Sequence, residues 1–197
     1  MKCHSLLAVL LAGLLVCCNT PQTQQHPEQQ PDGSALPPAK TVKPAVAASP
    51  VFSGQVDGVL RAYLSVKDAL VASDTAATNR AASDFLAKLA RTDASALSGQ
   101  AHGKWEAYRK MMARTTVTLQ ATAHLDDKRT GLEELSKLMY GVIRDFGLQT
   151  TLYKQYCPMA LNDKGAFWLS AQPEIRNPYF GDQMLACGQV QEVLSGK

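Results

Sequence analysis

The sequence predicts a mainly α-helical protein, an antiparallel four-helix bundle followed by a small C-terminal β-hairpin and loop lobe. Three observations support this fold class. Apolar residues recur at three- and four-residue steps in four stretches between positions 56 and 146. Short polar connections separate these stretches, as is typical of antiparallel helices. After Gly147 the composition changes to β-type residues separated by tight-turn signals.

Residues 1–18 have the pattern of a lipoprotein signal. Lys2 precedes an apolar run that is too short to cross a bilayer as a stable helix. The run ends in Cys17 and Cys18, and a leucine three positions before such a cysteine is typical of lipidation. We expect Cys18, or alternatively Cys17, to be lipidated and to anchor the protein to the bacterial cell envelope on the periplasmic side; the pattern does not distinguish the inner from the outer membrane. An ordinary secretory signal is the alternative.

Residues 19–50 are rich in proline, glutamine and small residues and have no apolar periodicity. Such a segment buries too little apolar surface to offset the entropy of ordering. We expect a disordered tether there, followed by one domain over residues 51–197.

The periodicity places four apolar helix faces at residues 56–70, 81–89, 105–119 and 132–146. Asp74 is expected to be the N-cap of the second helix. The third is expected to follow Gly103, and the fourth to begin near Asp126 or Asp127 and to end at Gly147.

Two strands and a turn are expected after the helices. The stretch 150–159 has β-type composition, the sequence NDKG at 162–165 is a turn signal, and AFWLS at 166–170 returns as a second strand. Asn177-Pro178 and Gly181-Asp182 mark another tight turn. The stretch 188–194 is compatible with either a strand or a helix.

Four sulfur-containing residues are the candidate functional site: Cys157, Met159, Met184 and Cys187. In an extended chain, side chains two apart share a face, and in a helical turn, side chains three apart do so. Each half would therefore present a thiol and a thioether from one side. Soft ligands of this kind favour Cu(I), whereas zinc rarely takes thioethers.

A disulfide is the competing interpretation of the two cysteines. In an exported domain, a bridge from Cys157 to Cys187 would close a loop of about thirty residues and stabilise the fold by roughly 3 kcal/mol. Both methionines would then be core residues. A reactive thiol is the weakest interpretation, because no CxxC pair and no neighbouring base are evident. We therefore expect no enzymatic activity.

The C-terminal motif resembles a bacterial family known only as a domain of unknown function. The matching segments are Tyr156-Cys157-Pro158-Met159-Ala160, Lys164-Gly165-Ala166, Trp168-Leu169-Ser170, Asn177-Pro178-Tyr179-Phe180-Gly181, Met184 and Cys187-Gly188. The resemblance implies a small exported or lipid-anchored protein. It also implies a link to heavy-metal efflux, since the family occurs as a C-terminal extension of periplasmic adaptor subunits of efflux pumps.

Together these observations predict a periplasmic lipoprotein that binds a soft metal ion, Cu(I) first, as a chaperone or sensor linked to an efflux pump adaptor. The alternative is a disulfide-stapled interaction module without metal. The net charge is only +3 and no block of basic residues is present, so nucleic acid is not an expected partner.

Replacing both Cys17 and Cys18 by serine tests the lipid anchor. Because no other residue of the run can accept the lipid, the exported protein should move from the membrane fraction to the soluble fraction. Immunoblotting of fractionated cells measures this change. A protein that is still exported and still membrane-bound would contradict the prediction.

Overall fold

The computed structural model of the chain describes residues 35–46 and 48–196. The predicted signal with Cys17 and Cys18, and residues 19–34 of the predicted tether, lie outside this part. Within it, no helix is both long enough and apolar enough to span a membrane.

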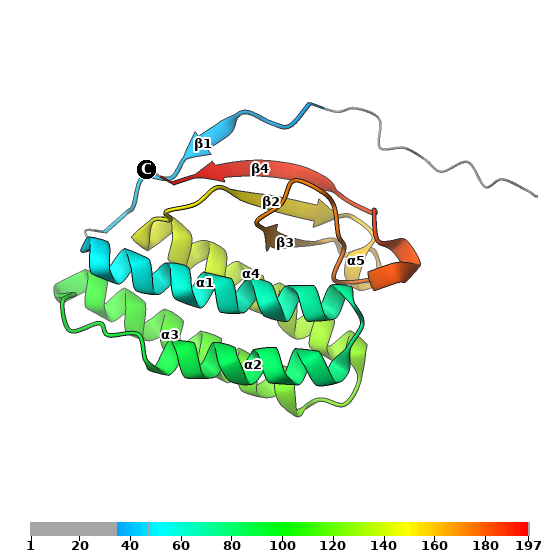
Figure 1. Cartoon of the computed structure of the whole chain (residues 1–197), viewed down its shortest axis with the longest axis horizontal. Coiled ribbons are helices and arrows are strands. Elements are labelled where there is room, and N and C mark those ends of the chain that lie inside the picture. The colour runs from blue at the N-terminus through cyan, green and yellow to red at the C-terminus, as the bar shows by residue number, and fades with distance from the viewer. Residues whose placement is uncertain (1–34, 47, 197) are drawn as a thin grey trace, which may run out of the picture. The chain divides into compact units, whose positions relative to one another are not determined.

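Four long helices make up most of the described chain: α1 (Pro50–Val71), α2 (Thr75–Ala90), α3 (Gly99–Ala121) and α4 (Leu125–Phe146). They lie alongside one another (Figure 1), with α1 in contact with α2 and α4, and α3 in contact with the same two helices. The predicted mainly helical class with a small C-terminal sheet is confirmed.

The helix ends follow from short capping residues. The Asp74 carboxylate accepts a hydrogen bond from the Ala77 N–H at 2.8 Å, which confirms the predicted N-cap of α2. The fourth helix stops at Gly147, whose φ of +87° suits only a residue without a β-carbon.

The third helix begins earlier than expected. It starts at Gly99 after the N-cap position Ser98, so Gly103 lies inside the helix and does not precede it. Glycine in a helix interior costs only about 1 kcal/mol relative to alanine, and the packing of Trp105, Met112 and Leu119 against the core overrides that preference.

The sheet contains four strands in the order β1-β4-β2-β3. Strands β2 (Leu152–Cys157) and β3 (Ala166–Ser170) form the predicted antiparallel hairpin. The last strand, β4 (Gln189–Ser195), pairs antiparallel with β2, so the stretch that was compatible with strand or helix is a strand.

Part of the predicted tether is structured, which corrects its boundary at about Pro50. Strand β1 (Ala39–Thr41) pairs in parallel with β4, and the Val42 N–H donates to the Ser195 carbonyl at 3.0 Å. The Val42 side chain is only 5% exposed. The edge of β4 supplies backbone partners that no local pattern in this polar segment indicates, so the domain begins before residue 51.

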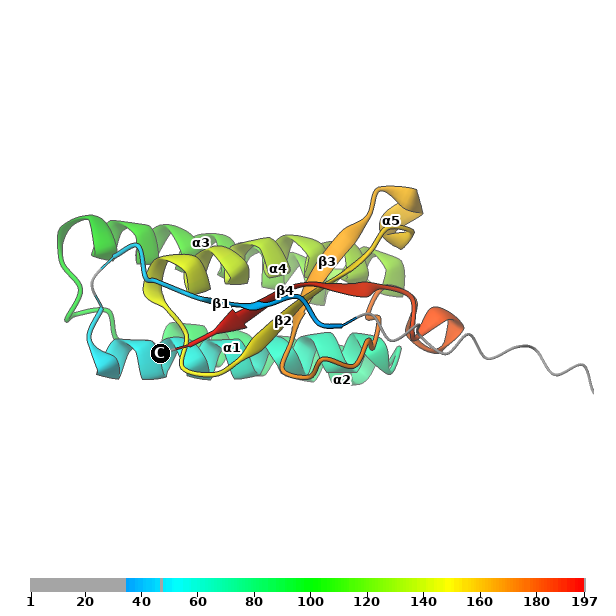
Figure 2. The ribbon, with the colours of Figure 1, turned by 90° about the horizontal axis from the view of Figure 1, so that it is seen from above.

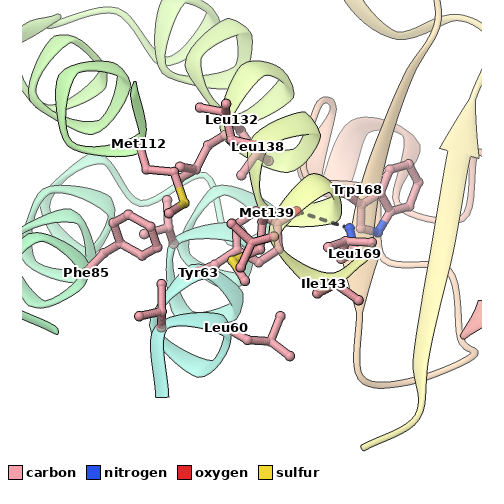
Figure 3. Packing of buried hydrophobic residues seen from close by; sticks show 14 of the residues in the cluster. Leu60, Tyr63, Phe85, Met112, Leu132, Leu138, Met139, Ile143, Trp168 and Leu169 are labelled. Atoms are coloured by element: carbon pink, nitrogen blue, oxygen red, sulfur yellow. Dashed lines mark hydrogen bonds between the residues drawn. The ribbon is translucent and has the colours of Figure 1, made fainter. Parts of the chain in front are cut away.

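The sheet covers one side of the α1 and α4 pair, while α2 and α3 lie on the other side (Figures 1 and 2). A buried hydroxyl joins the helices to the sheet: the Tyr63 oxygen lies 2.7 Å from Ser136 Oγ on α4 and accepts a hydrogen bond from the Leu169 N–H on β3 at 3.1 Å (Figure 3). Desolvation by burial raises the pKa of Tyr63 to about 12, so the phenol stays protonated.

Replacing Tyr63 by phenylalanine should lower the free energy of unfolding by about 1–3 kcal/mol. The change leaves the buried Leu169 N–H without its acceptor, and an unsatisfied buried donor costs about that much. Urea unfolding followed by circular dichroism measures the difference. Tyr153→Phe, which removes the same atom from a half-buried residue of β2, is the control and should change stability by less than about 0.5 kcal/mol.

Candidate thiol and thioether site

The site lies on the sheet face that carries Trp168, which is the face opposite to the one that carries Leu169. The Leu169 side chain lies beside Ile143 of α4, so the neighbouring Trp168 points to the opposite face (Figure 3). Gln155 is the cross-strand partner of Trp168 in the β2–β3 ladder and shares that face. Cys157, two residues along β2, shares it as well.

The segment 171–188 covers this face. The Gln155 amide nitrogen lies 3.0 Å from each of the carbonyl oxygens of residues 172–174, which share its two N–H donors. The ring of Tyr179 packs against that of Trp168 with centroids 5.9 Å apart, and its hydroxyl donates to the Phe167 carbonyl at 2.7 Å. The segment is therefore held to the sheet by both polar and aromatic contacts.

The sulfur atoms of Cys157 and Cys187 lie 2.7 Å apart, although thirty positions separate them in the chain. Cys157 is the last residue of β2 and is fully buried. Cys187 lies between the short 3₁₀ helix η1 (Gly181–Met184) and β4, and it is a half-buried residue packed against the core. Both are free cysteines. The structure thus brings together two of the four residues that the sequence singled out.

The Cys187 thiol holds its proton at neutral pH. Desolvation by burial, followed by the hydrogen bond and the charge interaction with Cys157, raises the pKa of Cys187 to about 11. Activated nucleophilic cysteines have lowered pKa values, so this environment does not activate Cys187 as a nucleophile.

Both methionines are less buried than Cys157. Strand β2 ends at Cys157, so the alternation that was expected to align Met159 with it does not extend past Pro158, and that part of the geometry was wrong. Met159 is 47% exposed and is not a core residue. Met184 is half-buried, and its carbonyl accepts a hydrogen bond from the Cys187 N–H at 3.0 Å.

The turn after Met159 has a left-handed backbone. Three successive residues of α5 (Ala160–Asp163) have positive φ: Leu161 at 54°, Asn162 at 59° and Asp163 at 61°. This conformation costs roughly 1–2 kcal/mol for each L-residue, although asparagine and aspartate tolerate it best. The NDKG turn is thus confirmed as a tight return between β2 and β3.

A glycine is required directly after Cys187. Gly188 has a φ of +140°, and a β-carbon there would lie 2.9 Å from the Tyr156 carbonyl oxygen and 3.0 Å from the Trp168 ring. Gly188 therefore allows the chain to pass close over β2 and β3, and this close passage places Cys187 above Cys157.

Two residues that position the site had been assigned no role from the sequence: Gln155 and Asn177. Both side chains are fully buried, and both hold backbone groups of the 171–188 segment. The available signal for Gln155 was a polar residue between Tyr153 and Cys157, with which it shares one face of β2. The Asn-Pro dipeptide marked a turn at Asn177 but said nothing of its distant partner.

The two cysteines of the predicted sulfur site are suitably placed for a soft metal ion. Two thiols in contact are ligands that Cu(I) prefers, and the exposed Met159 lies two positions from Cys157 in the chain. In the part of the chain that the structure describes, no group of three or more His, Cys, Asp or Glu side chains is placed to hold a metal ion.

A protein-family model described as "Protein of unknown function (DUF3347)" matches residues 59–151. Over these residues the chain is similar to that family. The match runs from within α1 to the residue before β2, so it covers the helices and stops short of the cysteine and methionine motif. No curated protein and no solved structure matches the chain.

Replacing Gly188 by alanine should destabilise the protein by about 1–3 kcal/mol, because φ at this position is one that L-residues rarely adopt and the added methyl group meets the Tyr156 carbonyl. Thermal unfolding measures the effect. The matched control is Gly103→Ala on α3, where nothing lies within 4 Å of an added β-carbon. The control should stabilise the helix by up to about 1 kcal/mol. Equal effects of the two changes would contradict the proposed close passage.

Proposed function

We propose that this chain is a cell-envelope protein that binds a soft metal ion, Cu(I) first, through Cys157 and Cys187, with Met159 and Met184 as thioether ligands. The observation on which the proposal rests is the 2.7 Å contact between two thiols that are thirty positions apart. Packing of the 171–188 segment onto the sheet produces this contact, and an all-sulfur donor set selects soft ions.

The exposure of Met159 supports a ligand role over a packing role. A methionine that served only to fill the core would be buried, whereas Met159 is 47% exposed and lies two residues from Cys157. An exposed thioether two positions from a buried thiol in the chain would be a suitable entry point for an ion that another protein delivers.

Metal uptake would require a small opening of the thiol pair. With metal–sulfur bonds of about 2.3 Å, the value for zinc, and a tetrahedral angle, the two sulfurs stand about 3.8 Å apart. The present separation of 2.7 Å is about 1 Å shorter. Cys187 lies between η1 and β4, and Cys157 lies at the end of a paired strand, so rotation of the Cys187 side chain about its Cα–Cβ bond is expected to provide this opening.

The remaining parts of the proposal come from the sequence. Lipidation at Cys18, or Cys17, would hold the protein on the periplasmic side of the envelope, and the four helices, packed as an antiparallel bundle, would be a rigid support for the site. In this setting the domain would act without catalysis, as a chaperone or sensor that exchanges metal with the adaptor of an efflux pump.

The second candidate is a disulfide-stapled interaction module without metal. The same contact favours it, since 2.7 Å is closer to the roughly 2.05 Å of a disulfide bond than to the separation across a metal ion. A bridge would fix the 171–188 segment on the sheet, and the segment or the helices would bind the partner protein.

Cu(I) titration of the reduced chain without its predicted signal tests the proposal. We expect one Cu(I) per chain by native mass spectrometry, with sulfur as the only neighbour in X-ray absorption. Met159→Leu should weaken binding at least about tenfold, because a ligand is lost, while stability changes by less than about 1.5 kcal/mol since volume and apolarity are kept.

Met111→Leu is the matched control for the methionine change. Met111 is 49% exposed on α3, far in the chain from the cysteines, and its replacement should leave Cu(I) binding unchanged. No stoichiometric Cu(I) uptake by the reduced protein would exclude the metal function. If both thiols of the exported protein also proved blocked to alkylation until reduced, the stapled module would be the better account.

A further inference from the structure

Asn177 is a fully buried amide whose polar groups are all engaged with the 171–188 segment. Its side-chain nitrogen donates to the Cys187 carbonyl at 2.8 Å, and its side-chain oxygen accepts from the Tyr179 N–H at 2.8 Å. Its backbone N–H donates to the Leu185 carbonyl at 2.8 Å. One residue therefore binds the chain on both sides of the 3₁₀ helix η1.

The backbone of Cys187 is held at both of its polar groups. Its N–H donates to the Met184 carbonyl at 3.0 Å, and its carbonyl accepts from Asn177. With both groups occupied, the peptide planes that flank Cys187 have little rotational freedom, so the direction of its Cα–Cβ bond is set. That direction leads to the Cys157 sulfur 2.7 Å away.

The rest of the segment has attachments that do not depend on Asn177. Gln155 binds the carbonyls of residues 172–174, and the Arg129 guanidinium donates to the Pro178 carbonyl at 3.1 Å. The Tyr179 hydroxyl binds β3. Of these side chains, only Asn177 bonds to Cys187 itself, so its contribution is separable from general attachment of the segment.

We propose that Asn177 is a positioning residue that sets Cys187 opposite Cys157, so that the two thiols act as a pair. This inference deepens the proposed function, on which its importance rests, by naming the residue that assembles the site. An amide is needed because the position must donate to one backbone group and accept from another. A carboxylate of the same shape accepts from Tyr179 but places an oxygen against the Cys187 carbonyl.

The test is the thiol–disulfide equilibrium of the chain without its predicted signal, in glutathione buffers. In this exchange, two protein thiols and one oxidised glutathione give one protein disulfide and two reduced glutathiones. The equilibrium constant has units of concentration, and it measures the effective concentration of the Cys187 thiol at the Cys157 thiol. Alkylation followed by mass spectrometry counts the free thiols. Asn177→Asp should lower this constant at least about tenfold, because Cys187 then samples other directions.

Gln155→Glu is the matched control, since it makes the same amide-to-carboxylate change at the other anchor of the segment. It should lower the constant less than about threefold. Equal losses in the two variants would show that the amides only hold the segment down, and would overturn the proposal. An unchanged constant in a folded Asn177→Asp protein would overturn it as well.

If Asn177→Asp does not fold, a measurement on the wild-type protein still tests the positioning role of Asn177. Oxidation of the thiol pair shifts the Cys187 peptide, so the side-chain amide resonances of Asn177 should move between the reduced and oxidised forms in nitrogen–proton spectra. Resonances that do not move would overturn the proposal. Neither measurement involves copper, so a failure of metal binding and a failure of this positioning role are separately visible.

Discussion

The buried hydroxyl of Tyr63 connects the two layers on which the rest of the structure depends. It interacts with Ser136 on α4 and with the backbone of Leu169 on β3, so one side chain of α1 is bonded both to the neighbouring helix and to the nearest strand of the sheet. Tyr63, Ser136 and Leu169 are fully buried, so water cannot take the place of a lost hydrogen-bond partner among them. The position of β3, and through the ladder of β2, follows from this contact.

The face of the same sheet that carries Trp168 holds the candidate site. Once β2 and β3 are placed, Gln155 and Trp168 present a polar and an aromatic anchor to the 171–188 segment, which folds back over them. The return of this segment brings Cys187 to Cys157. The thiol pair is therefore a product of two successive packings, helices on sheet and segment on sheet, and a loosening of either should separate the sulfurs.

Local sequence patterns predicted most helices and strands correctly, but they predicted the boundaries of these elements less well. The caps at Asp74 and Gly147 were evident because capping chemistry depends on a single short-range contact. The start of α3 was misplaced because Gly103 was taken as a boundary, although core packing overrides its small helix penalty. Strand β1 was missed because its pairing with β4 depends on a strand some 150 positions later, and nothing in its own composition indicates it.

The sequence by itself determined that the protein is mainly helical with a C-terminal hairpin, and it singled out the sulfur groups of Cys157, Met159, Met184 and Cys187. Helical periodicity, caps and turn residues are properties of neighbouring positions, so they can be recognised without coordinates. Only the tertiary structure decided that the two thiols touch, that Met159 is exposed, and that Asn177 binds Cys187. Those facts depend on where β2 and the 171–188 segment lie in space, which distant packing sets and local sequence does not encode.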